Sequence, residues 1–297
     1  MKTKVFKFGG ASNKKEVLQD PIFVKMLQKE ASNNTLFTVS ALEGVTRLLR
    51  LIFDSKIERL NKEFKDLIIH LSVNEFDRIH KDLIDSMFSG VEKHKVNIKF
   101  EEVKDSLISD LNGYKKDDSE EQFYASLVKH GELASSSIFN SYLCSIGIES
   151  ELLDARDFLT TDSNFKEAKI LEVNPALKKI FPRKTGVRVI QGFIARDSQG
   201  HDTVLGFDGS DLSASYFAVE LGALLTYWKN VDGFYQKDPS LFPSQKDVRR
   251  RMSISEYEEL PTHPIRLDSV KHAVENGIVV HMRSFLHPKG VDARIYA

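Results

Sequence analysis

The stretch KFGGAS, residues 7–12, follows the apolar run VFKF near the amino terminus. Residues 3–8 and 36–41 are rich in Val, Phe and Thr, which predicts two short buried strands. Adjacent glycines at a strand end let backbone N–H groups approach a ligand closely. We expect a helix to begin near Asn13 and to point its positive end at the same place, where Lys7 adds a charge. This arrangement suits phosphate, although the stretch taken alone is better explained by a tight strand-to-helix turn with a surface lysine.

The composition is typical of a soluble globular protein, with 41% of the 297 residues hydrophobic and 29% charged. Lys and Arg number 42 and Asp and Glu number 43, so we expect no nucleic-acid partner. Cys144 is the only cysteine, which excludes an intrachain disulfide and favours a cytoplasmic location. No signal peptide and no membrane-spanning run is recognisable, so we expect no membrane partner.

Strand-like and helix-like segments alternate along the chain. Residues 45–111 repeat apolar residues at helical spacing, whereas residues 113–122 are polar and predict a connection. A further helix follows in SLVKHGELASSSIFNSYLCSIGI, with Glu132 expected near its start. Further strands are expected in ESELLDA, VRVIQGFIA, LLTYWKNV and IVVHMRS. This alternation predicts an α/β protein with a largely parallel central sheet.

Five more motifs follow KFGGAS in order along the chain. They are TVSALEGVTRLL with Ser40, Gly44 and Thr46; HGELASS with Glu132; LLDARDFLTTD with Asp154 and Asp157; GFDGSDLSA with Gly206, Gly209, Ser210 and Asp211; and WKNVDGFYQKDP with Asp232, Gly233, Tyr235 and Asp238. In this order and spacing the set resembles the catalytic domain of aspartate kinases, within the amino-acid kinase superfamily. The patterns of that family are KFGGTS, VSAMSGVTN, GE, LDARD, GRGGSD and WTDVDGVYTADP. The resemblance covers nearly all of the chain and thins in residues 45–122 and after residue 243.

The resemblance implies one amino-acid kinase domain over residues 1–297, with no regulatory domains after it. The expected fold is a three-layer α/β/α sandwich with a mainly parallel central sheet. Residues 1–192 would form a substrate and phosphate lobe with a helical insertion near residues 45–120, and residues 193–297 a nucleotide lobe. We expect KFGG at the carboxyl end of the first strand, the edge at which open α/β sheets bind ligands.

The same resemblance assigns roles to individual residues. Lys7 would reach the transferring phosphate, Gly9 and Gly10 would donate N–H groups to it, and Lys7 and Asp211 would be the catalytic pair. The residues that match substrate contacts are Ser40, Thr46, Glu132 and Asp211, of which the two carboxylates would hold an ammonium group. The residues that match the nucleotide site are Lys229, Asn230, Asp232, Gly233, Tyr235 and Asp238. ATP is the implied cosubstrate, with Mg²⁺ carried on its phosphates, and no protein metal site is expected.

Two departures from the family pattern concern the substrate. KFGGTS becomes KFGGAS, so Ala11 removes one hydroxyl group. GRGGSD becomes GFDGSD, so Phe207 replaces the arginine that clamps a substrate carboxylate in the family. Asp208 would repel an acid if it pointed inward. Arg156, Arg196 or another cation would have to replace the lost clamp.

Two more departures concern the nucleotide. Lys229 and Asn230 replace a threonine and an aspartate, and Ile265 occupies the position of a second phosphate-binding lysine. Arg266 and Lys229 are the candidates for the missing charge.

Three functions remain open at this point. The first is phosphorylation of the side-chain carboxylate of L-aspartate by ATP. The second is a kinase reaction on another small amine-bearing substrate without the usual α-carboxylate, which Phe207 favours. The third is a non-catalytic paralogue that binds a ligand or a partner, which Lys229, Asn230 and Ile265 favour. The oligomeric state is open, and a homodimer is one alternative.

Overall fold

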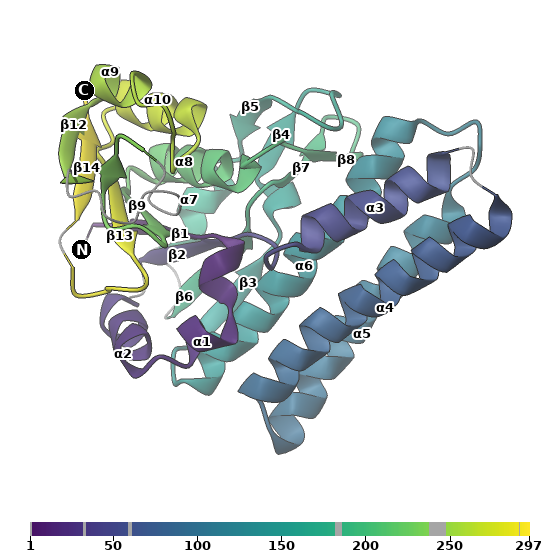
Figure 1. Ribbon diagram of the computed structural model, residues 1–297. Helices are drawn as coiled ribbons and strands as arrows, with labels where there is room; N and C mark the ends of the chain where they lie inside the picture. The colour runs from purple at the N-terminus through teal and green to yellow at the C-terminus, as the bar shows by residue number, and fades with distance from the viewer. Residues whose placement is uncertain (1, 32–33, 59–60, 182–185, 238–247, 291) are drawn as a thin grey trace.

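The computed structural model describes residues 2–31, 34–58, 61–181, 186–237, 248–290 and 292–297. Asp238, one of the residues predicted to bind nucleotide, lies outside these ranges. An α/β body carries an arm of long helices along one side (Figure 1). The helices are α1 (Lys15–Leu18), α2 (Pro21–Glu30), α3 (Val45–Ile57), α4 (Lys62–Met87), α5 (Gly90–Gly113), α6 (Glu120–Ser145), α7 (Ala176–Ile180), α8 (Gly209–Leu221), α9 (Ile254–Glu258) and α10 (Leu267–Glu275), with 3-10 turns η1 (Gly10–Asn13) and η2 (Ala155–Asp157).

The main sheet has eight strands in the order β12-β14-β13-β9-β1-β2-β6-β3. Every neighbouring pair is parallel except β13 with β14. The strands are β1 (Lys4–Phe8), β2 (Thr35–Val39), β3 (Ser150–Leu153), β6 (Val187–Gln191), β9 (Leu224–Lys229), β12 (Arg251–Ser253), β13 (Val280–Ser284) and β14 (Ala293–Tyr296). The prediction of an α/β fold with a mainly parallel sheet is therefore confirmed, and the strand that carries KFGG lies at its centre.

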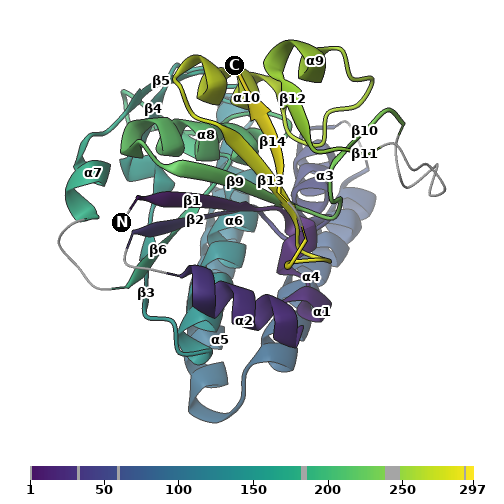
Figure 2. The same cartoon turned by 90° about the vertical axis from the view of Figure 1, so that its left-hand side faces the viewer.

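Helices cover both faces of this sheet, which makes the three predicted layers (Figure 2). On one face, the ring of Phe8 packs against Phe23 of α2, Phe139 of α6 and Trp228 of β9, with ring centroids 5.6–6.0 Å apart. Side chains alternate between the faces along a strand, so Lys7 points to the opposite face, which α8 covers. One central strand thus supplies both the aromatic core and a buried lysine.

A second sheet, which the sequence did not predict, has the order β5-β4-β7-β8. Its strands are β4 (Leu159–Thr161), β5 (Ile170–Val173), β7 (Ile194–Asp197) and β8 (Asp202–Val204), and a small pair is formed by β10 (Phe234–Tyr235) and β11 (Val248–Arg249). The chain passes from the main sheet to the second at Gly192, where a Cβ atom would lie 2.5 Å from Cβ of Ser210. The division into lobes at residues 192 and 193 stays a prediction.

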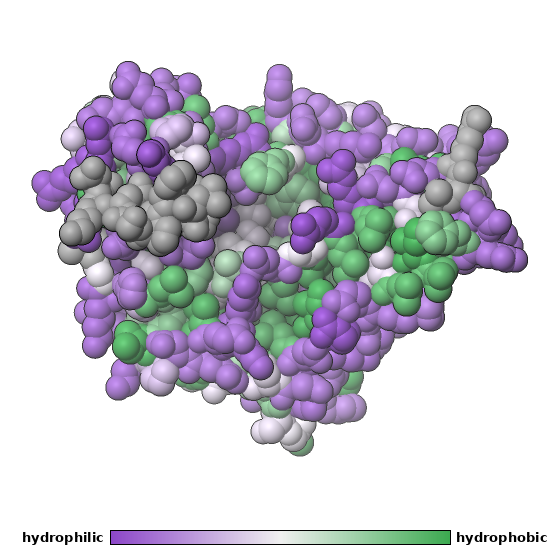
Figure 3. Space-filling view, viewed as in Figure 1, coloured by the Kyte–Doolittle hydropathy of each residue, from purple (hydrophilic) through white to green (hydrophobic). Residues whose placement is uncertain are grey.

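The predicted helical insertion is the arm formed by α3, α4 and α5 (Figure 1). Apolar side chains gather over α3 and the amino-terminal half of α4 (Figure 3). The exposed apolar side chains there are Leu51, Phe64, Leu67 and Leu71. Across the described part of the chain, no helix combines the length and apolar character that crossing a membrane requires.

The helix expected near Asn13 begins at Lys15, after the short 3-10 turn η1 and the extended residue Lys14. One local prediction was wrong. Glu132 lies in the middle of α6 and not at its start. That helix begins at Glu120, where the hydroxyl of Ser119 accepts a hydrogen bond from the N–H of Gln122. Residues 113–122, which we expected to form a connection, therefore contain the cap and the first turn of α6.

Candidate active site

Lys7 and Asp211 form a buried ion pair on the α8 face of β1. Lys7 Nζ lies 2.6 Å from Asp211 Oδ1, and the two side chains are 5% and 0% exposed. Burial by itself raises the pKa of Asp211, but the charges of Lys229 and Lys7 hold it at about 2. Burial lowers the pKa of Lys7, and Asp211 opposes this shift. The ionised carboxylate therefore fixes the lysine beside the Gly9–Gly10 turn.

Asp211 has two further donors. Lys229 Nζ, at the end of β9, lies 2.9 Å from Asp211 Oδ2, and the backbone N–H of Arg266 donates to the same oxygen at 3.2 Å. The sequence grouped Lys229 with the nucleotide-binding residues, and the structure brings it to Asp211, which also binds Lys7. One carboxylate thus holds two ammonium groups.

The Gly9–Gly10 turn packs against the loop that follows β2. A Cβ atom at Gly10 would lie 2.6 Å from the carbonyl oxygen of Ala41 and 2.8 Å from the nitrogen of Glu43. Both contacts are to backbone atoms, so glycine is required for the close approach of the two loops. A Cβ atom at Gly9 would make an ordinary contact of 3.6 Å with Lys7 Nζ. Donation of the two N–H groups to phosphate stays a prediction.

Glu132 is a buried carboxyl group on α6 that reaches the same loop. Its Oε1 accepts a hydrogen bond from the N–H of Ala41 at 3.2 Å. Its Oε2 is buried and has no hydrogen-bond partner among the described residues. Burial raises the pKa of Glu132 to about 8, against the opposing effects of the Ala41 hydrogen bond and the Lys7 charge. A buried, unpartnered oxygen is suited to accept from a ligand donor.

Ser40 and Thr46 flank this loop. The carbonyl oxygen of Ser40 accepts from Ser135 Oγ at 2.8 Å and from Asn13 Nδ2 at 3.4 Å. Thr46 lies in the first turn of α3, after the left-handed residue Gly44. The sequence analysis missed Asn13 and Ser135. The available signals were an asparagine three residues after Gly10 and the run of serines at residues 135–137.

Phe207 does not fill the position of an arginine inside the site. Its side chain is 88% exposed, and Asp208 beside it is exposed with a left-handed backbone at φ 52°. Arg266 Nη1 donates to the carbonyl oxygens of Leu205 and Phe207 at 2.7 and 2.9 Å. Its Nε and Nη2 donate to Asp268. The guanidinium of Arg266 is therefore committed to the Phe207 loop and to Asp268.

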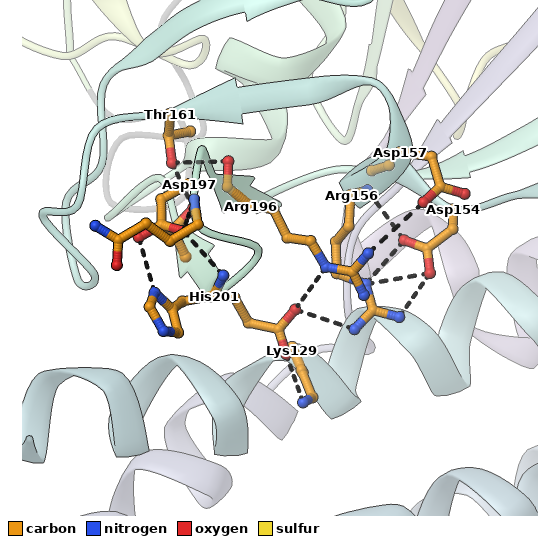
Figure 4. Close-up of polar contacts among 12 residues, drawn as sticks. Lys129, Asp154, Arg156, Asp157, Thr161, Arg196, Asp197 and His201 are labelled. Atoms are coloured by element: carbon orange, nitrogen blue, oxygen red, sulfur yellow. Dashed lines mark hydrogen bonds and ion pairs between the residues drawn. The ribbon is translucent and has the colours of Figure 1, made fainter. Parts of the chain in front are cut away.

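Arg156 and Arg196, two other candidates for the missing clamp, converge on Asp202 (Figure 4). Arg156 also pairs with Asp154 at 2.6 Å, and Arg196 lies 3.7 Å from Asp157. The same carboxylate, Asp202, pairs with Lys129 of α6 at 2.7 Å (Figure 4). Each arginine thus already has carboxylate partners, and the LDARD motif forms part of a structural network.

The loop after β9 carries the other residues predicted to bind nucleotide. The hydroxyl of Tyr235 donates to Asp232 Oδ1 at 2.5 Å, which ties the two ends of the loop together. Gly233 packs so tightly that a Cβ atom there would lie 2.2 Å from Val248 Cγ1. Asn230 is exposed. Within the described ranges, no group of three or more His, Cys, Asp or Glu residues could hold a metal ion.

The chain matches a known protein family and is similar to individual members of it. The model of the Amino acid kinase family matches residues 2–288. An aspartokinase of Thermus thermophilus is 31% identical over 166 residues, which are 53% of this chain and 40% of that protein. The matched segment therefore spans about two fifths of the length of that relative.

Solved structures extend the comparison to the whole chain. Escherichia coli aspartokinase III in complex with aspartate and ADP matches 99% of this chain and 65% of its own, with a TM-score of 0.79 and 22% identity. An isopentenyl phosphate kinase structure matches 99% of both chains with a TM-score of 0.52 and 13% identity. The chain belongs to the amino acid kinase family, and the predicted resemblance to its aspartokinase branch is confirmed.

Proposed function

We propose that this protein transfers the γ-phosphoryl group of ATP to the side-chain carboxylate of L-aspartate, giving 4-phospho-L-aspartate. The observation that carries the proposal is the buried Lys7–Asp211 pair, with Nζ and Oδ1 2.6 Å apart beside the Gly9–Gly10 turn. Family membership and the aspartokinase relatives support it.

The chemistry requires positioning and charge stabilisation more than proton transfer. An ionised carboxylate oxygen of the substrate forms a bond to the γ-phosphorus, while the bond from that phosphorus to the β–γ bridging oxygen breaks and ADP leaves with the electron pair. The nucleophile is already ionised, so no general base is needed. Lys7 would stabilise charge on the phosphoryl oxygens during transfer.

The amine end of the substrate would lie near Glu132. Its free Oε2 is an acceptor for the substrate ammonium, and Ser40 and Thr46 border the same loop. Mg²⁺ would be held chiefly by the ATP phosphate oxygens, because both oxygens of Asp211 already accept from lysines. It would neutralise phosphate charge during transfer.

A second substrate class is favoured by the contacts around Phe207. This side chain is exposed, and Arg156, Arg196 and Arg266 all have carboxylate partners. A substrate that lacks the α-carboxylate but carries an amine would need no clamp of this kind. We therefore propose such a molecule as the alternative acceptor.

A coupled assay of ADP release with a panel of amino acids and amines tests the proposal. Turnover with aspartate, lost in Lys7→Ala, supports aspartate phosphorylation. Turnover only with amines that lack the α-carboxylate supports the alternative. Absence of turnover with every acceptor, at saturating ATP, would refute both and leave the non-catalytic paralogue.

A further inference from the structure

Lys229 and Lys7 project from the same face of the main sheet. The neighbouring strands β9 and β1 are parallel, with Tyr227 paired to Lys7. Paired residues share a face, and residues two apart along a strand share it too. Lys229 therefore follows Tyr227 on the face that carries Lys7, one step nearer the carboxyl edge. This is also the edge at which the Gly9–Gly10 turn lies.

The two lysines share a single carboxylate. Asp211 Oδ1 lies 2.6 Å from Lys7 Nζ, and Asp211 Oδ2 lies 2.9 Å from Lys229 Nζ. The Asp211 side chain is fully buried, that of Lys7 is 5% exposed and that of Lys229 is 16% exposed. Two lysines thus share one carboxylate, and Asp208 is a further negative charge that acts on Lys7. Of the two lysines, Lys229 is the more accessible to an incoming anion.

The two other positions considered for this charge do not place a cation beside Lys7. Ile265 is fully buried, and its backbone N–H and carbonyl both bond to the hydroxyl of Tyr257. The guanidinium of Arg266 bonds to two backbone carbonyls and to Asp268. Only the backbone of Arg266 reaches Asp211. Of Lys229 and Arg266, only Lys229 has its charged group at Asp211, beside Lys7.

We propose that Lys229 is a phosphate-binding residue that acts with Lys7 on the terminal phosphates of the nucleotide. It would supply, from the end of β9, the second phosphate-binding charge that the resemblance to aspartate kinases implies at the position of Ile265. The inference rests on the proposed function for the identity of the ligand. It goes further in assigning to Lys229 a direct phosphate contact rather than the role of a counter-ion to Asp211.

The first experiment measures binding of adenosine, ADP, ATP and inorganic tripolyphosphate by calorimetry, with no acceptor present. In Lys229→Met we expect affinity for ATP and for tripolyphosphate to fall by about tenfold or more, as for loss of one charge-assisted contact. Affinity for adenosine should not change. Lys229→Arg should retain most of the phosphate affinity. The matched control is Lys81→Met, because Lys81 on the arm also bridges two carboxylates, Asp77 and Glu101.

A second experiment uses the unaltered chain, in case Lys229→Met fails to fold. Lysines are labelled by reductive methylation and read out by mass spectrometry. Tripolyphosphate should slow labelling of Lys229 and leave Lys81 unaffected. Equal labelling of Lys229 with and without tripolyphosphate, or unchanged phosphate affinity in a folded Lys229→Met, would overturn the inference.

The outcomes also separate this inference from the proposed function. If no acceptor is phosphorylated but Lys229 still determines tripolyphosphate affinity, the function is refuted and the inference stands. If aspartate is phosphorylated and Lys229→Met binds ATP as tightly as the unaltered chain, the function stands and the inference falls.

Discussion

Binding of an amine-bearing ligand should depend on pH through Glu132. The pKa of this buried carboxyl is raised to about 8, so the group is protonated at neutral pH in the ligand-free protein. An ammonium group beside Oε2 favours the ionised carboxylate, and binding must then release a proton. Below pH 8, each unit of pH lowered weakens binding by up to about tenfold, or about 1.4 kcal/mol. Asp211, with a pKa of about 2, stays ionised throughout this range.

The assay is calorimetric titration with L-aspartate at pH 6, 7 and 8, in two buffers of different ionisation enthalpy. We expect about one proton released per ligand at pH 6 and about half a proton at pH 8. Affinity should rise about fiftyfold from pH 6 to pH 8, since the ionised fraction of a group with this pKa rises by that factor. An affinity independent of pH, with no proton release, would refute the reasoning.

Glu132→Gln is the matched variant, because it keeps the shape of the side chain and cannot ionise. Its ligand affinity should show no dependence on pH between 6 and 8. Thermal stability provides a second measurement of the pKa shift of Glu132. The folded pKa of Glu132 lies above the ordinary value of 4.5, so its stabilising effect is complete below pH 4.5 and is lost as pH rises toward 8. The melting temperature of the unaltered chain should fall relative to Glu132→Gln across that window.

Three further changes test the site. Lys7→Ala should lower kcat by about a hundredfold or more through loss of a cation at the transferring phosphate, and a kcat equal to that of the unaltered chain would exclude Lys7 from that role. Gly10→Ala should lower the free energy of unfolding by about 1–3 kcal/mol, because its Cβ would press on backbone atoms, whereas Gly113→Ala, with no atom within 4 Å of the new Cβ, should not. Denaturant titration measures both. Phe207→Arg should lower the KM for aspartate and Phe207→Ala should not, and equal effects of the two in steady-state kinetics would show that charge is not the reason.

The core of the fold was predictable because its strands carry a strong local signal. Residues of β1, β2 and β9 are buried on both faces, so they appear in the sequence as short runs of Val, Phe, Leu and Tyr. The glycine pair directly after β1 then predicted a candidate site at the edge where parallel strands end. The arm was predictable because α3 and α4 repeat apolar residues at helical spacing.

The second sheet and the position of Glu132 within its helix could not be predicted from the sequence, each for a different reason. Strands β4 and β8 are three residues long, too short for an alternating pattern to show. Helix α6 is buried on nearly all sides, so its sequence carries no polar face to mark its extent. The partnership of Lys229 with Asp211 depends on the register between β1 and β9, which a single sequence does not specify.

The departures from the family pattern concern either the phosphate side of the candidate site or its substrate side. On the phosphate side, Lys229 is the proposed replacement for the charge absent at Ile265, because its ammonium lies within 3 Å of the carboxylate that holds Lys7. On the substrate side, the charge absent at Phe207 has no such replacement, because Arg156 and Arg266 are both bonded to carboxylates. The contacts around Phe207 therefore support the alternative acceptor, an amine without an α-carboxylate, and they leave the proposed phosphate contact of Lys229 unaffected.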